Sequence, residues 1–76
     1  MDEIEVLDMV ALLIDLPELG LRRGAVGTIV EQFEVTEHHP GGWIVEFVSP
    51  DGEEYIEADI TDAAQIVKLH FQRLAA

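Results

Sequence analysis

The amino-acid sequence predicts an all-β domain of five short strands that curl into a small barrel, with one short helical turn before the last strand. Turn-forming residues divide the chain into pieces too short for long helices. Several of these pieces are rich in β-branched and aromatic residues, and 76 residues can bury only one small core. We therefore expect a single domain over residues 1–76, with the barrel at about residues 8–71 and flexible ends.

The first strand is expected to begin at about Met9, within the apolar run of residues 8–14 (DMVALLI). We favour a strand because Pro17 ends the run early and the rest of the chain has a β pattern. A long loop rich in turn residues follows at residues 15–24. Four apolar residues at helical spacing leave an amphipathic helix as the alternative for the first 14 residues: Ile4, Leu7, Ala11 and Ile14.

The middle of the chain predicts a strand at residues 25–34, a polar loop at residues 35–42 and a hairpin at residues 43–60. The tetrad at residues 49–52 (SPDG) predicts a tight turn, because Pro sets φ at its second position and Gly closes it. Beyond the turn the side chains alternate between two sides, with Ile56, Ala58 and Ile60 on one and Tyr55, Glu57 and Asp59 on the other.

The last segment predicts one helical turn at residues 62–65 and then a strand, whereas Thr61 and Asp62 fit the cap of the longer helix that is the alternative. In that strand Val67, Leu69 and Phe71 alternate with Ile66, Lys68 and His70. A C-terminal helix remains the alternative, because four apolar residues share a helical face: Ala63, Val67, Phe71 and Leu74.

This order of elements describes a small SH3-like barrel, in which a curled sheet leaves few open edges. The apolar side chains that we expect in its core are Val10, Leu12, Val26, Val30, Val45, Phe47, Ile56, Ile60 and Leu69.

The sequence resembles a small uncharacterised bacterial family, a domain of unknown function with an SH3-like fold. The resemblance covers roughly residues 8–70. It rests on an Asp-x-Val-Ala-Leu opening, an Asp-Leu-Pro-Glu turn and a Gly-x-Val-Gly-Thr-x-Val-Glu strand, at residues 8–12, 15–18 and 24–31. Residues 45–48 (VEFV) and 51–52 (DG) match the second hairpin of the family.

The resemblance implies short stand-alone proteins, some of which act beside a neighbouring uncharacterised protein, as in a toxin–antitoxin or immunity pair. It implies no catalytic residues. Residues 24–30 also resemble the strand–loop–strand KOW motif of ribosomal and transcription proteins. KOW domains that contact RNA generally carry basic residues, whereas this chain has only Arg22 and Arg23 near the motif.

Acidic residues dominate the charge of the chain, with 16 Asp and Glu against four Lys and Arg and a net charge of −12. Because phosphate groups are bound mainly by Lys and Arg, we expect no nucleic-acid partner and no attraction to anionic membranes. The chain has no apolar run long enough to span a bilayer, and its start (MDEIEV) lacks the basic region of a signal peptide. A cytoplasmic protein is the expectation.

The acidic residues are unevenly placed along the chain. Residues 1–62 hold all 16 acids and two of the bases, which makes their charge −14, whereas residues 63–76 hold the other two bases and no acid. Residues 46–62 carry seven acids and no base. One interpretation is an acidic face that steers a basic protein partner, and the alternative is a charge that only keeps a small apolar domain soluble.

Neither catalysis nor metal binding is predicted. The chain has no cysteine, and a barrel of this size has no room for a substantial pocket. His38 and His39 lie in the polar loop, where Glu37 or His70 can join them around a metal ion, but an exposed loop is the favoured interpretation. Acids at residues 51–54 do not match the spacing of a calcium loop. We therefore expect no cofactor.

Aromatic and acidic side chains are the candidate partner-binding residues. Trp43 and Tyr55 are the expected anchors, since Trp and Tyr are common at protein interfaces. The acids expected beside them are Glu46, Asp51, Glu53, Glu54, Glu57 and Asp59. The hypothesis is a small acidic protein-binding module that neutralises a basic partner. The alternative is an assembly protein that forms a homodimer through an edge strand and exposed aromatic residues.

Overall fold

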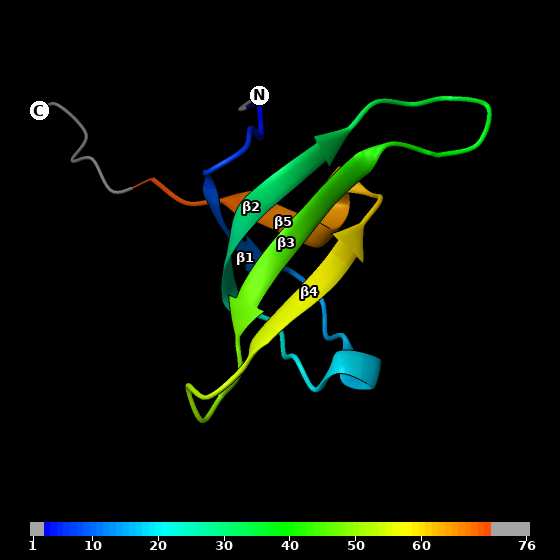
Figure 1. Cartoon of the computed structure of the whole chain (residues 1–76). Helices are drawn as coiled ribbons and strands as arrows, with labels where there is room; N and C mark the ends of the chain where they lie inside the picture. Colours follow the sequence, from blue (N-terminus) through cyan, green and yellow to red (C-terminus); the bar gives the residue numbers. More distant parts are fainter. Residues whose placement is uncertain (1–2, 71–76) are drawn as a thin grey trace, which may run out of the picture.

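A computed structural model describes residues 3–70 as one antiparallel five-stranded sheet (Figure 1). The strands are β1 (Met9–Leu12), β2 (Val26–Phe33), β3 (Gly42–Val48), β4 (Tyr55–Ile60) and β5 (Ile66–Lys68). The 3-10 turns η1 (Pro17–Leu19) and η2 (Ala63–Gln65) lie in the β1–β2 loop and before β5. The all-β prediction is confirmed. Within residues 3–70, no helix has the length and apolar character needed to cross a membrane.

The prediction of a closed barrel is wrong. The strand order is β4-β3-β2-β1-β5, so β4 and β5 are the two edges of the sheet, and no ladder joins them within the described residues. The sheet is bent, with β1 and β5 behind the layer of β2, β3 and β4 (Figure 1). Because β5 is only three residues long, it offers too little backbone to close the sheet against β4.

One apolar core lies in the bend of the sheet. Its buried side chains are Val10, Leu12, Leu21, Ile29, Val45, Phe47, Ala58, Ile60 and Ile66. Five of these residues were expected in the core: Val10, Leu12, Val45, Phe47 and Ile60. The prediction therefore succeeds for β1 and β3 and for the end of β4, and it fails mainly in β2.

In β2 the predicted inward side is reversed. Val26 is 46% exposed and Val30 is 38% exposed, whereas Gly27 and Ile29 face the core. A Cβ atom on Gly27 would lie 2.7 Å from Val45 Cγ1 and 2.8 Å from Phe47 Cδ1, so those side chains fill the space over the glycine. A prediction from the alternation of apolar side chains misses Gly27, because this inward position carries no side chain. A bulge between Ile29 and Glu31 further shifts the register at Val30.

The expected core positions Ile56 and Leu69 are also corrected. Ile56 is half-buried and packs against the margin of the core. Leu69 lies beyond the end of β5, where its N–H donates to the Met9 carbonyl oxygen at 2.9 Å and its side chain is half-buried. Ile66 takes the buried position in β5. β5 ends at Lys68, so the predicted continuation of the strand is wrong at residues 69–70, and Phe71 lies outside the described residues.

The hairpin at residues 43–60 and the helical turn before the last strand are confirmed. In the hairpin turn, the Gly52 N–H donates to the Ser49 carbonyl oxygen at 2.8 Å, and Gly52 has φ +77°. Asp62 caps η2, because its Oδ1 accepts from the Ala64 N–H at 2.9 Å. Both helical alternatives are wrong for the described residues, since residues 9–12 and 66–68 are strands.

Candidate functional site

The β3–β4 hairpin has one buried side and one exposed side. The alternating residues Val45, Phe47, Ala58 and Ile60 are buried in the core. The residues between them therefore point to the outer side of the sheet. This outer side carries Glu46, Glu57, Asp59 and Tyr55, which we call the acidic face. The sequence prediction placed Tyr55, Glu57 and Asp59 on one side of the strand, and the structure adds Glu46 opposite them.

Glu46 and Glu57 are direct cross-strand neighbours on the acidic face. The Ser49 N–H donates to the Glu54 carbonyl oxygen at 2.8 Å, which makes Ser49 and Glu54 a hydrogen-bonded pair. Pairs alternate along an antiparallel ladder, so Glu46 and Glu57 form a non-hydrogen-bonded pair, the type with the closer side chains. Like charges that face each other in this way destabilise a sheet.

No salt bridge to Glu46 or Glu57 forms among the described residues. A salt bridge joins Lys68 to Asp8, at 3.2 Å and in a different part of the molecule. Tyr55 is 74% exposed and follows directly along β4 from the acids of the hairpin turn. The acidic face therefore presents uncompensated carboxylates beside an accessible aromatic ring.

The turn acids extend the negative charge beyond the end of β4. Asp51, Glu53 and Glu54 are exposed in the β3–β4 turn. The Asp51 carboxylate accepts the Ser49 hydroxyl and the Glu53 N–H, the latter at 3.0 Å. The Ser49 hydroxyl, followed by the Glu53 N–H, lowers the pKa of Asp51 below its ordinary value. Asp51 thus shapes the turn as well as adding charge.

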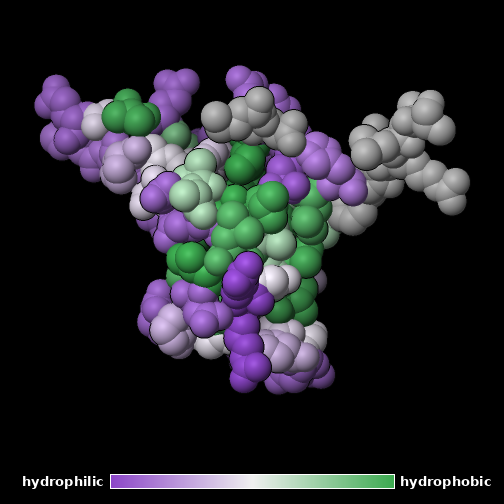
Figure 2. Space-filling view, turned by 180° about the vertical axis from the view of Figure 1, so that it is seen from behind, coloured by the Kyte–Doolittle hydropathy of each residue, from purple (hydrophilic) through white to green (hydrophobic). Residues whose placement is uncertain are grey.

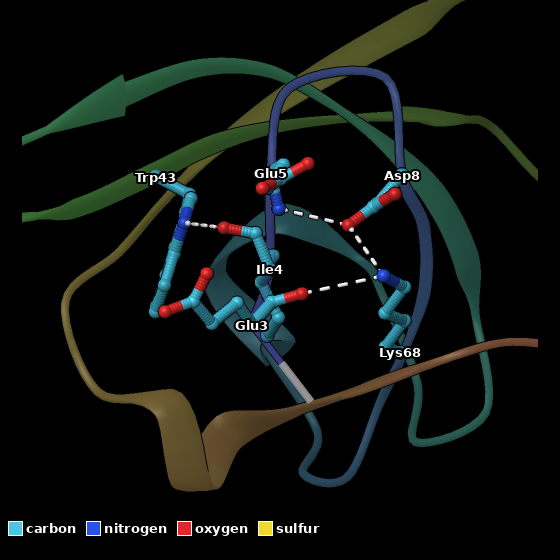
Figure 3. A network of polar contacts seen from close by, with 6 residues as sticks. All are labelled: Glu3, Ile4, Glu5, Asp8, Trp43 and Lys68. Carbon is cyan, nitrogen blue, oxygen red and sulfur yellow. Dashed lines mark hydrogen bonds and ion pairs between the residues drawn. The ribbon is translucent and has the colours of Figure 1, made fainter. Parts of the chain in front are cut away.

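Trp43 is not part of the acidic face. It lies on the core side of β3 opposite Ile60, at the other end of the ladder from Tyr55. Its indole N–H donates to the Ile4 carbonyl oxygen at 3.3 Å, and the ring packs against the core (Figure 3). The two expected aromatic anchors therefore share no groove. Alternation along the strands separates them. Trp43 falls on the same side as Val45 and Phe47, whereas Tyr55 falls on the side opposite Ile56.

A polar network holds this N-terminal segment over the core (Figure 3). The Asp8 Oδ2 accepts the Glu5 N–H at 2.8 Å and lies 3.2 Å from Lys68 Nζ. Lys68 Nζ also donates to the Glu3 carbonyl oxygen at 3.3 Å. The Glu5 N–H, with a smaller contribution from Lys68, lowers the pKa of Asp8. We interpret this network as structural, because its groups satisfy one another.

An apolar groove that the sequence did not predict opens beside the acidic face. It has a volume of about 570 Å³, and its lining includes Leu21, Arg22, Val26, Val48 and Pro50. Val48 pairs with Tyr55 across the ladder, which brings the groove next to that ring. The groove joins the β1–β2 loop to the β3–β4 turn, and only the tertiary fold brings these segments together. The sequence does not reveal this groove, because the exposure of Val26 is seen only in the structure.

The back of the molecule has a different character. Seen from behind, apolar surface covers its middle (Figure 2). β1 and β5 lie on this side, and exposed apolar side chains on or next to these strands are Met9, Leu13 and Val67. We call these three residues the apolar back face.

The two loop histidines are placed by local contacts. The His39 ring lies 4.8 Å from the Phe33 ring, and its Nδ1 accepts the Gly41 N–H at 2.9 Å. The His38 backbone N–H donates to Thr36 Oγ1. No group of three or more His, Asp or Glu side chains within residues 3–70 is arranged to hold a metal ion.

Together these features define a small acidic all-β domain with an edge hairpin that carries acidic residues on its outer side and in its turn. The chain belongs to the family described as "Domain of unknown function (DUF4926)", which matches residues 6–66. The expected membership of a domain-of-unknown-function family is thus confirmed, and the match runs from just before β1 to the first residue of β5. Comparison with curated proteins gives no significant match, and neither does comparison with solved structures.

Proposed function

We propose that this protein is a small protein-binding module that engages a basic protein through the acidic face. The observation that carries the proposal is the cross-strand Glu46–Glu57 pair, which forms no salt bridge among the described residues. Such a like-charge pair destabilises the sheet, where favourable cross-strand pairs contribute about 0.2–1 kcal/mol each. Lys or Arg side chains of a partner would remove this destabilisation on binding.

The residues of the site have different roles in this proposal. The carboxylates of Glu46, Glu57 and Asp59 attract the partner, and the acids of the turn extend their field. Tyr55 supplies an exposed aromatic anchor. The neighbouring groove, lined by Val26 and Val48, accepts an apolar side chain of the partner.

The proposal includes a biological setting and a finer fold class. We infer a cytoplasmic, non-enzymatic protein that neutralises its partner, in the manner of an antitoxin or immunity protein. The resemblance of the motifs at residues 8–31 to small proteins that act beside a neighbour supports this setting. The strand order and the short helical turn before β5 support an open variant of the SH3-like barrel.

The test is a binding titration between this protein and the product of the adjacent gene, at low and high salt. We expect association at low salt that weakens as salt rises, because exposed charges are screened beyond about 10 Å at 0.1 M ionic strength. Glu57→Gln should weaken binding, whereas Glu34→Gln should leave it unchanged, since Glu34 is exposed outside the acidic face. No association at low salt would remove the neutralising role, and binding that ignores salt would remove the steering role.

A second candidate function is self-association, and the apolar back face favours it. Met9, Leu13 and Val67 are exposed apolar side chains on or next to β1 and β5. The back of the molecule shows apolar surface in its middle (Figure 2). Two copies that buried this surface would form a homodimer and leave both acidic faces outward. Sedimentation over a concentration series separates the candidates, because a strict monomer at high concentration excludes the assembly role.

A further inference from the structure

β4 has a free edge, and the hairpin register shows which residues offer it. β4 is the last strand of the sheet, and within residues 3–70 no strand pairs with its outer side. Ser49 and Glu54 form a hydrogen-bonded pair, so the same parity makes Ile56, Ala58 and Ile60 direct their backbone groups toward β3. The backbone N–H and C=O groups of Tyr55, Glu57 and Asp59 therefore point away from the sheet.

The residues that offer the free edge are also the residues that build the acidic face. Tyr55, Glu57 and Asp59 are all exposed, and their side chains lie on the outer side of β4. A segment that paired with this edge would place every second side chain directly beside them, since side chains alternate along a strand. Backbone pairing and charge recognition would thus use the same three positions.

Resting on the proposed function, we propose that the basic partner docks by adding an extended segment to β4 as a sixth, antiparallel strand. Its Lys or Arg side chains lie at alternate positions and face Glu57 and Asp59. Addition of a strand to an open sheet edge takes affinity from main-chain hydrogen bonds and specificity from alternate side chains. The register of β4 thus supports both parts of the proposal: the main-chain pairing and the basic side chains of the partner segment.

Charge selects this occupant over a second copy of the chain. If two β4 strands overlapped fully about a two-fold axis, Glu57 would face Glu57 of the other copy, with Glu46 beside each. Four carboxylates would then meet around the axis. Charged side chains protect open edges from self-pairing in this way. The same charges favour a basic strand.

The probe is a short synthetic peptide, blocked at both ends, in which Lys and Val alternate. When Lys faces the acidic face, the N–H groups of its Lys residues point toward β4 and those of its Val residues point away. Backbone N-methylation of the Lys residues therefore removes the edge hydrogen bonds, whereas N-methylation of the Val residues keeps them. The two methylated peptides have the same charge and size, so they form a matched pair.

We expect the parent and the Val-methylated peptide to bind with similar affinity and the Lys-methylated peptide to bind at least about tenfold more weakly. The Lys-methylated peptide loses several main-chain hydrogen bonds to the edge at once, and a tenfold change corresponds to about 1.4 kcal/mol. Binding of the parent peptide should also slow amide exchange at Tyr55, Glu57 and Asp59.

A pair of protein variants tests the same edge from the other side. Glu57→Pro removes an outward N–H and leaves the ladder to β3 in place, since Pro is accepted on edge strands where the N–H faces solvent. Glu57→Gln removes the same charge and keeps the N–H. We expect Glu57→Pro to weaken peptide binding several-fold more than Glu57→Gln. If Glu57→Pro does not fold, the methylated peptides decide the question on the unmodified protein.

The outcomes separate strand addition from the general function. Equal, salt-dependent binding of all three peptides would overturn strand addition and leave the acidic binding function intact. The same holds if the peptides do not bind and the adjacent gene product does. If neither binds at low salt, both proposals fail.

Discussion

The two sides of the β3–β4 hairpin share one backbone and have opposite energetics. On the inner side, Val45, Phe47, Ala58 and Ile60 are buried and stabilise the fold. On the outer side, Glu46 faces Glu57 across the ladder without a salt bridge among the described residues. Alternation along a strand allows one side to be selected for packing and the other to carry charge at some loss of stability. Packing and stability therefore explain the residues of the inner side and do not explain the acidic residues of the outer side.

The largest expected effect comes from the inner side. Phe47 is fully buried, and Phe47→Ala should lower the free energy of unfolding by about 3–5 kcal/mol, because it removes apolar contacts and leaves a cavity. Tyr55→Ala is the matched outer change and should lie within about 0.5 kcal/mol of the parent. Urea unfolding measures both. Similar losses for the two variants would contradict the division of the hairpin into two sides.

Substitution of Trp43 tests whether this residue belongs to the inner side of the hairpin. Trp43→Phe retains an aromatic ring and removes the N–H that donates to the Ile4 carbonyl oxygen. We expect a loss of about 0.5–1.5 kcal/mol in unfolding free energy, together with faster amide exchange at Leu7, whose N–H donates to Ile29. Partner affinity should not change. A loss of affinity without a loss of stability would assign Trp43 to the binding surface instead.

On the outer side, removal of a charge should raise stability. Glu57→Gln should increase the unfolding free energy by about 0.2–1 kcal/mol, because it ends the repulsion with Glu46. The gain should shrink at high salt, and Glu34→Gln serves as the control outside the hairpin. A lower unfolding free energy for Glu57→Gln would show that the Glu57 carboxylate makes a favourable contact that outweighs its repulsion with Glu46.

The smallest effect concerns Asp8, an acid that has partners. Its pKa is lowered in the folded protein by the Glu5 N–H and by Lys68. A lowered folded pKa contributes stability above the unfolded pKa, and this stability is lost as pH falls through the folded pKa. Asp8→Asn should therefore lower the urea midpoint at pH 7 and have a smaller effect at a pH below 3.8, the ordinary Asp pKa. An equal change at both pH values would show that charge is not involved.

Local signals explain which parts of the fold were predictable. The hairpin was predicted because residues 49–52 specify a tight turn and the side chains beyond it alternate cleanly. The common outer side of Tyr55, Glu57 and Asp59 follows from the same alternation. The phase of β2 was not predictable, since Gly27 occupies an inward position without a side chain and the alternation of Val26 and Val30 points to the wrong side.

Tertiary contacts explain the rest. Alternation with Val45 and Phe47 places Trp43 on the inner side, but its contact with Ile4 depends on how the N-terminal segment packs. The apolar groove depends on the approach of Val26 to Pro50, far apart in the chain. Closure of the barrel depended on the length of the last strand, and the alternation of residues 66–71 continues beyond the point where β5 ends.

The chain contains one tryptophan and one tyrosine, and they lie on opposite sides of the same hairpin. This placement gives each side its own optical reporter without any label. Indole fluorescence follows the packing of the N-terminal segment against Trp43, because its ring is half-buried there. Absorbance of the Tyr55 phenol follows the outer side, where a bound partner would change its solvation. Unfolding and partner binding can therefore be observed as separate spectroscopic signals from a single sample.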